Sequence, residues 1–195
     1  RNNTFPSASS VIKKIDFNML SKSQIINSEM IVYGKRKSRT IKSRGYSEGL
    51  NKNFTEYLYP KREKGTKMLR LDDRLWIYSP STDRIIQLSG HLLRQSLMGS
   101  DLSYEDMMEE RKLSEIYNAK IVAEEKIENR DVWKMELTAL VDDINYFKRI
   151  LWVDQQRYVP LKEDLFAKSG ELLKRISFYN FKKTEGRWYP RKMNY

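Results

Sequence analysis

The pattern of apolar and polar positions near the N-terminus is helical. Apolar residues there recur at spacings of one, three and four, which places them on one side of a helix. These residues are Val11, Ile12, Ile15, Met19 and Leu20. Ser9-Ser10 comes just before them, and serine is a favoured helix N-cap. The pattern predicts an amphipathic helix over residues 9–21.

From about Asn27 the pattern changes to short runs rich in β-branched and aromatic residues, separated by turn residues. Connections such as Asp72-Asp73, Glu128-Asn129 and Ser169-Gly170 tolerate tight or left-handed turns. Connections this short join antiparallel neighbours. The runs predict strands at residues 28–34, 37–48, 53–60, 66–71, 74–79, 83–89, 118–127, 130–140, 145–153, 158–167, 172–182 and 187–194.

One segment interrupts the strand pattern, between Leu92 and Leu113. Gly99-Ser100-Asp101 breaks the chain, and Ser103 followed by Asp106 has the spacing of a capping box. The segment therefore predicts a second helical piece, over residues 101–112, inserted between two sets of strands. Such a chain is mainly β with helices that cover the sheet. No repeat or linker interrupts it, so we expect a single domain over residues 1–195.

Composition narrows the possible chemistry. Hydrophobic residues make up 39% of the 195 residues, enough for a folded core. The chain has no cysteine, which excludes disulfides, cysteine zinc sites and thiol catalysis within it. No stretch approaches the roughly 18 consecutive apolar residues that a membrane-spanning helix requires.

The positive charge is concentrated in the first half of the chain. Residues 1–100 carry 19 lysines and arginines against 8 acidic residues, whereas residues 101–195 carry 18 of each. This asymmetry favours an anionic partner, such as a lipid headgroup, an acidic protein or nucleic acid, although a solvated basic face would have the same composition. The candidates for contact with that partner are Lys35, Arg36, Lys37, Arg39, Lys42 and Arg44.

Catalytic motifs are missing from the sequence. The one histidine, His91, has no cysteine or second histidine with which to share a metal ion. No Gly-x-Ser-x-Gly nucleophile elbow, dinucleotide fingerprint or phosphate loop occurs. Carboxylate pairs such as Asp142-Asp143 are sequence neighbours that suit turns and solvated surface. We therefore expect no enzyme activity, no metal and no cofactor.

Large apolar side chains are in surplus. The runs Leu75-Trp76-Ile77-Tyr78 and Ile150-Leu151-Trp152-Val153 are apolar at consecutive positions, so both faces of these strands should be buried. A well-filled β core would explain this, and so would an apolar cavity lined by aromatic and methionine side chains. The candidates for such a cavity are Leu69, Trp76, Tyr78, Met98, Met107, Trp133, Met135, Leu137, Leu151, Trp152 and Phe178.

Three stretches resemble one protein family. Lys64-Gly65-Thr66 through Tyr78-Ser79-Pro80 resembles the "kGt-xLr-xgd-xLWiY-xP" hairpin of the outer-membrane lipoprotein-sorting proteins of the LolA-like and LolB-like group. Residues 95–106, with Gly99-Ser100-Asp101 at their centre, resemble the "qSfmGSDfsyeD" segment of the same group. Trp152-Val153-Asp154 with the following residues 158–162 is similar to its "WvD…y-P-k" strand pair.

The resemblance implies an incomplete antiparallel barrel, a curved sheet of about 11 strands, covered by the N-terminal helix and the mid-chain helical insert. It implies a periplasmic, non-catalytic carrier that binds lipoprotein acyl chains or other lipids. Its partners would then be an inner-membrane transporter and an outer-membrane acceptor, with peripheral membrane contact.

We accordingly expect an export signal before Arg1, and a lipidated precursor would carry its anchoring cysteine there too. Gly99-Ser100-Asp101 should serve the turn and helix start, with Asp101 or Ser103 as cap. Two alternatives stay open at this point. One is an envelope scaffold or sensor whose cavity is filled by its own side chains, and the other is a nucleic-acid-binding sheet with Tyr33 and Tyr46 beside the basic cluster. We expect no nucleic acid.

Overall fold

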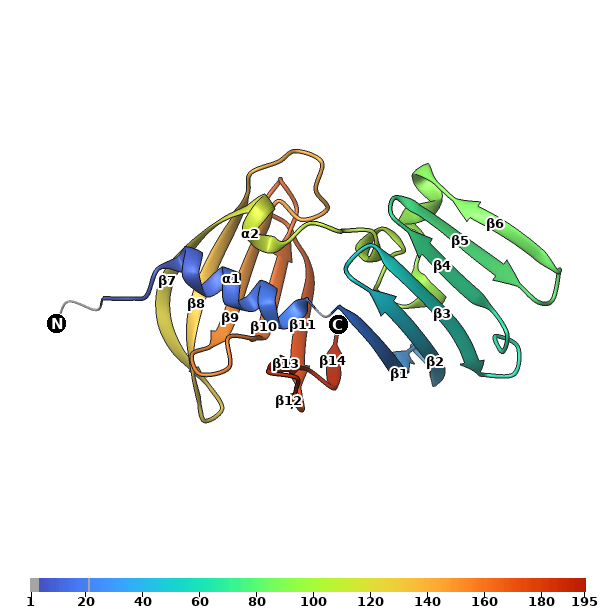
Figure 1. The fold of residues 1–195 in the computed structure, drawn as a ribbon, viewed down its shortest axis with the longest axis horizontal. Coiled ribbons are helices and arrows are strands. Elements are labelled where there is room, and N and C mark those ends of the chain that lie inside the picture. Colours follow the sequence, from blue (N-terminus) through green and yellow to red (C-terminus); the bar gives the residue numbers. More distant parts are fainter. Residues whose placement is uncertain (1–3, 21) are drawn as a thin grey trace. The chain divides into compact units, whose positions relative to one another are not determined.

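The computed structural model describes residues 4–20 and 22–195 (Figure 1). Arg1 and residue 21, the last residue of the predicted helix, lie outside this range. The chain forms two compact units. The terminal unit combines Arg1–Leu20 with Arg111–Tyr195, and the central unit is Ser21–Glu110. Within the described residues, no helix has the length and apolar character needed to cross a bilayer.

The terminal unit is a curved, six-stranded antiparallel sheet with a helix across one face (Figure 1). Its strand order is β14-β11-β10-β9-β8-β7. A small hairpin, β12–β13, is added near the C-terminus. The bounds are α1 (Ala8–Met19), α2 (Leu113–Ile116), β7 (Tyr117–Ile127), β8 (Arg130–Ala139), β9 (Lys148–Asp154), β10 (Pro160–Phe166), β11 (Leu172–Tyr179), β12 (Lys182–Thr184), β13 (Arg187–Tyr189) and β14 (Lys192–Asn194).

Helix α1 confirms the predicted amphipathic helix. It begins after Ser7, whose hydroxyl accepts a hydrogen bond from the Ser10 amide at 3.4 Å. Val11, Ile12 and Ile15 are buried against the sheet, and Val11 and Ile15 have no exposed surface, whereas Met19 at the end of the stripe is half exposed. Burying one side chain of this size contributes about 2 kcal/mol. The apolar stripe alone therefore explains why the helix lies on the sheet.

Two buried polar residues of α1 fix its position on the sheet. The Asp16 carboxylate accepts hydrogen bonds from the amides of Leu113 and Ser114 at 3.0 and 3.1 Å, and so caps α2. The Asn18 amide group donates to the carbonyls of Arg157 and Tyr158, both at 3.0 Å. Because each buried polar atom finds a backbone partner, the helix gains a defined register.

The central unit is a second six-stranded antiparallel sheet, with strands in sequence order from β1 to β6. Residues 89–110 follow β6 and form three short 3-10 turns, and we call them the cover segment. The bounds are β1 (Ser23–Tyr33), β2 (Ser38–Glu48), β3 (Lys52–Tyr59), β4 (Lys67–Leu71), β5 (Arg74–Ser79), β6 (Arg84–Leu88), η1 (Gly90–Arg94), η2 (Leu97–Gly99) and η3 (Glu105–Met107).

The predicted fold class is confirmed: the protein is mainly β, with antiparallel sheets that do not close. The chain forms four strands in place of the two predicted at 172–182 and 187–194. Asn180, with positive φ, follows the end of β11, and Pro190, which has no amide hydrogen, lies between β13 and β14. The expected helix at 101–112 is wrong in type. That stretch holds one 3-10 turn, and the regular helix α2 begins only at Leu113.

Asp154 organises the turn after β9. Its side chain is fully buried and pairs with Arg130 at 2.6 and 3.0 Å, and it accepts hydrogen bonds from the amides of Gln156 and Arg157 at 2.8 and 3.0 Å. Burial acts to raise the pKa of Asp154, but the hydrogen bonds from Arg130 and the two amides outweigh it and lower this pKa. The aspartate of the Trp-Val-Asp motif is thus a structural anion.

Replacing Asp154 with asparagine should lower the free energy of unfolding by about 1–3 kcal/mol at neutral pH, because the substitution removes charge-assisted hydrogen bonds. A lowered folded-state pKa stabilises the protein above the unfolded value, about 3.9, and this contribution is lost as the pH falls through the folded value. Urea unfolding at several pH values should therefore show the gap between wild type and Asp154→Asn narrowing below about pH 4. A gap independent of pH would contradict this role.

Candidate functional site

The cover segment lies on one face of the central sheet and forms an apolar cluster with it. The fully enclosed residues of this cluster are Met68, Leu75 and Leu97. Partly buried residues surround them, namely Ile77, Leu88, Leu93, Leu102, Tyr104, Met107 and Met108. Three of the ten side chains are methionines, which are unbranched and adapt to guests of irregular shape. We take this covered face as the candidate site.

Local hydrogen bonds shape the cover segment around the Gly99-Ser100-Asp101 motif. Met98 and Gly99 both have positive φ, of 51° and 71°. The Ser100 hydroxyl donates to the Leu97 carbonyl at 2.6 Å, which closes the turn. Ser103 and Asp106 then exchange the two bonds of a capping box, at 2.9 and 3.3 Å. The predicted turn and the cap at Ser103 are confirmed.

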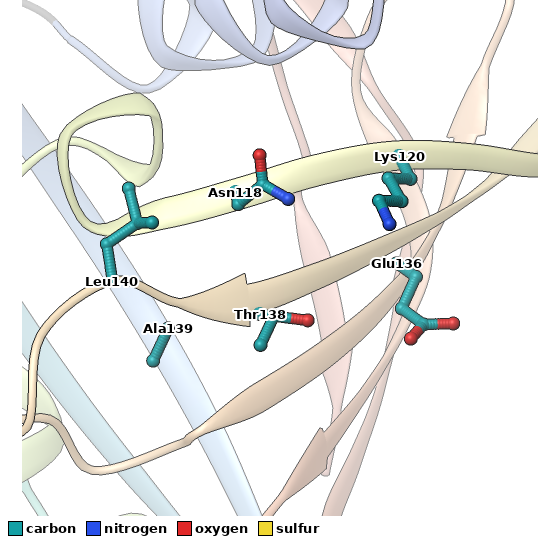
Figure 2. Close-up of a pocket in the computed structure, with 6 residues that line it drawn as sticks. All are labelled: Asn118, Lys120, Glu136, Thr138, Ala139 and Leu140. Atoms are coloured by element: carbon teal, nitrogen blue, oxygen red, sulfur yellow. The ribbon is translucent and has the colours of Figure 1, made fainter.

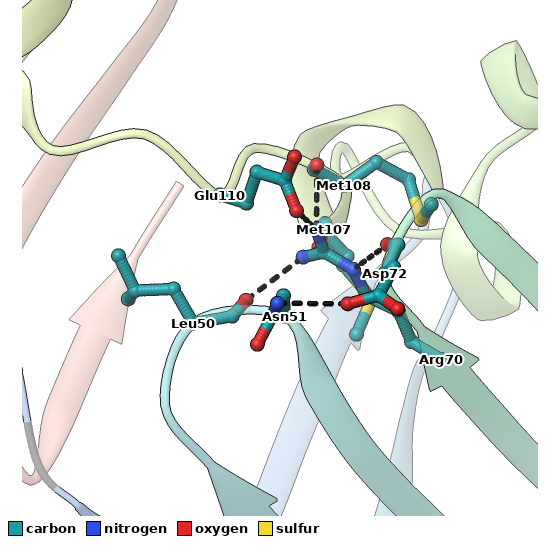
Figure 3. Close-up of polar contacts among 7 residues, drawn as sticks. All are labelled: Leu50, Asn51, Arg70, Asp72, Met107, Met108 and Glu110. Atoms are coloured by element: carbon teal, nitrogen blue, oxygen red, sulfur yellow. Dashed lines mark hydrogen bonds and ion pairs between the residues drawn. The ribbon is translucent and has the colours of Figure 1, made fainter.

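Arg70 clasps the cover segment to the sheet (Figure 3). Its side chain is almost fully buried, and it donates to the carbonyls of Met107 and Met108 at 2.6 and 2.9 Å. It also donates to the carbonyls of Leu50 and Asp72 at 3.0 and 2.9 Å. One guanidinium therefore joins a strand, two turns and the cover segment.

Glu110 completes the surroundings of Arg70. Its carboxylate lies 3.8 Å from the guanidinium and is half exposed. Burial lowers the pKa of Arg70, and the nearby Glu110, Glu109 and Asp72 act in the opposite direction. An arginine stays protonated under such conditions, so a full positive charge is held beneath the cover.

A second arginine holds the middle of the cover segment. Arg39, from β2, donates to the carbonyl of Met98. Its guanidinium also occupies the space where a side chain on Gly99 would lie. The positive φ favours glycine at this position, and a larger residue would displace the Arg39 guanidinium from the Met98 carbonyl.

Two tyrosines lie on the covered side of the sheet, Tyr57 buried and Tyr104 partly buried. Burial raises the pKa of the Tyr57 phenol, and Tyr104 and Glu63 raise it further. Burial also raises the pKa of Tyr104, and Glu63 adds to this shift. Both phenols stay neutral at physiological pH, so the covered face offers an apolar environment apart from the two arginines.

The predicted cavity residues separate into several groups. Met107 alone contributes to the cluster under the cover segment. Met98 lies in the turn that Arg39 holds. On the central sheet, Leu69 pairs with Trp76, and Tyr78 follows two residues later, so these three side chains share the opposite, uncovered face.

In the terminal unit, four candidates lie beneath α1. Trp133, Met135, Leu137 and Leu151 are all buried and belong to the same cluster as Val11, Ile12 and Ile15. They pack the interface between helix and sheet. The arrangement is a filled core in this conformation.

The last two candidates in the terminal unit lie elsewhere. Trp152 is next to Leu151 in a strand and so points to the opposite face, where its indole nitrogen donates to Glu125 at 2.8 Å. The stems of Lys134 and Lys162 flank the ring, with ammonium groups 5.5 and 4.2 Å from its centre. Phe178 packs on a separate small cluster.

A pocket of about 370 Å³ lies on the face of β7 and β8 away from α1 (Figure 2). Asn118, Lys120, Glu136 and Thr138 supply most of its lining. None of the predicted cavity residues borders it. A lining of charged and amide groups does not suit an acyl chain, so this pocket is not the candidate site.

The anionic-partner candidates also separate by face. Lys35, Arg36 and Lys37 are exposed in the turn between β1 and β2. Lys42 and Arg44 are two residues apart in β2, so both point to the uncovered face of the sheet. Arg39 points to the covered face and is engaged with the Met98 carbonyl.

Sequence reasoning missed Arg70 and Met68 as parts of the site. One signal was available for both. The strand reads Lys67-Met68-Leu69-Arg70-Leu71, so an arginine shares the buried face with Met68, and such an arginine must bind carbonyls or carboxylates.

The sequence offered His91 as its one histidine, and the structure shows where it lies. His91 is exposed at the start of the cover segment. In the described part of the chain, no three histidine, aspartate or glutamate side chains gather as metal ligands would. The chemistry available at the covered face is apolar burial together with hydrogen bonding by Arg39 and Arg70.

The chain is similar to several known proteins. A family model described as "uncharacterized protein" matches residues 49–195. A proposed outer membrane lipoprotein-sorting protein domain from Vibrio parahaemolyticus is 26% identical, with a TM-score of 0.82 over 95% of this chain and 83% of that one. A LolA superfamily protein from Nitrosomonas europaea is 25% identical, with a TM-score of 0.75 over 97% and 84% of the two chains.

A DUF1329 family protein from Desulfovibrio piger has the same fold. It is 23% identical, with a TM-score of 0.85 over 95% of this chain and 83% of that one. No curated protein matches the chain.

Replacing Arg70 with leucine should lower the free energy of unfolding by about 3 kcal/mol, because four buried carbonyls lose a charged donor. Hydrogen exchange should quicken at the amides of Met107 and Met108, which bond within the turn that Arg70 holds. Unfolding in guanidinium chloride measures the first effect, and hydrogen exchange measures the second. Arg84→Leu, at an exposed position of β6, is the matched control. An equal loss of unfolding free energy in both variants would contradict the proposed role of Arg70.

Proposed function

Since this chain belongs to the LolA-like family of outer-membrane lipoprotein-sorting proteins, we propose that it is a non-catalytic periplasmic carrier of acyl chains. Its cargo would be a lipoprotein or another lipid, accepted from a donor in the inner membrane and passed toward the outer membrane. The two units would act together as one carrier domain over residues 1–195.

The observation that carries the proposal is the covered face of the central sheet. An apolar cluster lies between the sheet and a segment of short 3-10 turns, with Met68 on the sheet and Met107 and Met108 on the segment. Arg39 and Arg70 of the sheet hold the segment by hydrogen bonds to a few of its backbone carbonyls. These side-chain bonds take the place of regular pairing between strands. Such a cover can lift without breaking any strand of the sheet.

Energetics supports exchange of this kind. An acyl chain of about 16 carbons gains roughly 0.8 kcal/mol for each methylene removed from water, on the order of 10 kcal/mol in all. Release then requires an acceptor that offers similar burial. The arginine clasps would favour the closed state when no chain is present, because their carbonyl partners are satisfied only there.

We propose Met107 as the first contact of the chain, since it belongs to both the cover segment and the apolar cluster. The residues beneath α1 would meet the chain only after that helix moves. Leu69, Trp76 and Tyr78 lie on the uncovered face and are not part of this binding surface.

Met107→Gln should weaken binding of a fluorescent fatty acid about tenfold, because an amide buried without a partner costs at least about 1.4 kcal/mol. Met19→Gln is the matched control, since Met19 is 52% exposed on α1. Fluorescence titration measures both variants against the wild type. Equal affinities in all three proteins, or no saturable binding by the wild type, would refute the proposal.

A further inference from the structure

We infer that the uncovered face of the central sheet, with the basic tip of the β1–β2 hairpin, docks this carrier on an anionic lipid surface. The inference goes beyond the cargo site, because it concerns the opposite face of the sheet. It rests on the register of the strands, on the exposure of their side chains and on the placement of charge.

Strand register places an apolar row across five strands. Ile25 faces Tyr46, Tyr46 faces Phe54, Phe54 faces Leu69, and Leu69 faces Trp76. Residues directly opposite in neighbouring strands point to the same side of the sheet. The rings of Tyr46 and Phe54 lie 6.3 Å apart, as this arrangement requires.

More apolar side chains share this face near its ends, and several are strongly exposed. Ile25 is 67% exposed, Tyr33 is 80% exposed and Ile85 is 71% exposed. An antiparallel sheet normally presents polar residues on the side that faces solvent. A row of apolar residues on that side marks an interaction surface.

Basic side chains accompany the apolar row. Lys35, Arg36 and Lys37 form the exposed hairpin tip, two to four residues from Tyr33. Within the row's own neighbourhood, the Arg74 guanidinium lies 5.4 Å from the centre of the Trp76 ring.

Lys67 repeats this arrangement next to Tyr78, with its ammonium 5.7 Å from the ring centre. Long cationic side chains that lie along aromatic rings keep their charge at the level of the solvent. Trp and Tyr with Lys and Arg are the combination that proteins place at the headgroup level of membranes.

The chemistry of the face favours a lipid surface over other anionic partners. The face carries aromatic rings, but exposed aliphatic side chains such as Ile25 and Ile85 lie among them, and these add nothing to the stacking of nucleic-acid bases. An anionic bilayer interface attracts basic residues and accepts aliphatic and aromatic side chains together. The face also carries Glu29 and Glu56, so binding should depend on the hairpin tip for most of its net attraction.

The experiment is vesicle flotation of the full chain, with phosphatidylcholine vesicles that contain or lack phosphatidylglycerol. Wild type should bind only the anionic vesicles, and added salt should weaken the binding. The triple variant Lys35→Ser/Arg36→Ser/Lys37→Ser should bind at least about tenfold more weakly. Ile25→Ser/Ile85→Ser should also weaken binding and leave the remainder more sensitive to salt.

Matched controls remove the same groups from the terminal unit. Lys182→Ser/Lys183→Ser/Lys192→Ser removes equal charge from exposed positions, and Val122→Ser/Leu140→Ser removes exposed apolar side chains. Both should bind vesicles as the wild type does. Equal losses in face variants and controls would overturn the inference, and so would binding to an oligonucleotide or an acidic protein without binding to anionic vesicles.

The outcome is independent of the cargo proposal. Face variants should retain wild-type binding of a fluorescent fatty acid in solution, whereas Met107→Gln should retain vesicle binding. A failure of either function therefore appears in its own assay.

Discussion

The central unit depends on the buried guanidinium of Arg70. The cover segment forms irregular turns, and carbonyls near its C-terminal end take hydrogen bonds from a side chain of the sheet. Arg70 supplies them to Met107 and Met108 while it binds the turns at Leu50 and Asp72. A cation removed from water in this way is stable only while all those carbonyls stay in place, which ties the shape of the sheet to the position of its cover.

The two units cover the apolar face of their sheets in different ways. In the terminal unit, a regular helix with an apolar stripe covers the sheet and is held by Asp16 and Asn18. In the central unit, irregular turns and methionines cover the sheet. A regular helix gives a tightly filled core, whereas short turns over flexible side chains leave a surface that can repack. We therefore place exchange of cargo in the central unit.

The central sheet also has two faces with different neighbours. Its covered face carries Met68 and Leu75, and its uncovered face carries the row from Ile25 to Trp76. Alternation along each strand makes this possible, because neighbouring residues such as Leu75 and Trp76 belong to different surfaces. The consecutive apolar residues of this strand therefore belong to two different surfaces. We propose one surface for cargo and the other for docking, as described above.

The sequence by itself determined the helix at the N-terminus, nearly all the strands, the capping box at Ser103 and Asp106, and the family, because these depend on local periodicity, turn chemistry and short motifs. The sequence could not show which of the apolar residues lie on the same surface. Trp152 and Leu151 look alike in sequence, yet one lies between lysine stems and the other beneath α1. That division, and the role of Arg70 and Arg39, was decided only by tertiary structure, because strand register and the path of the cover segment determine which carbonyls and side chains each residue meets.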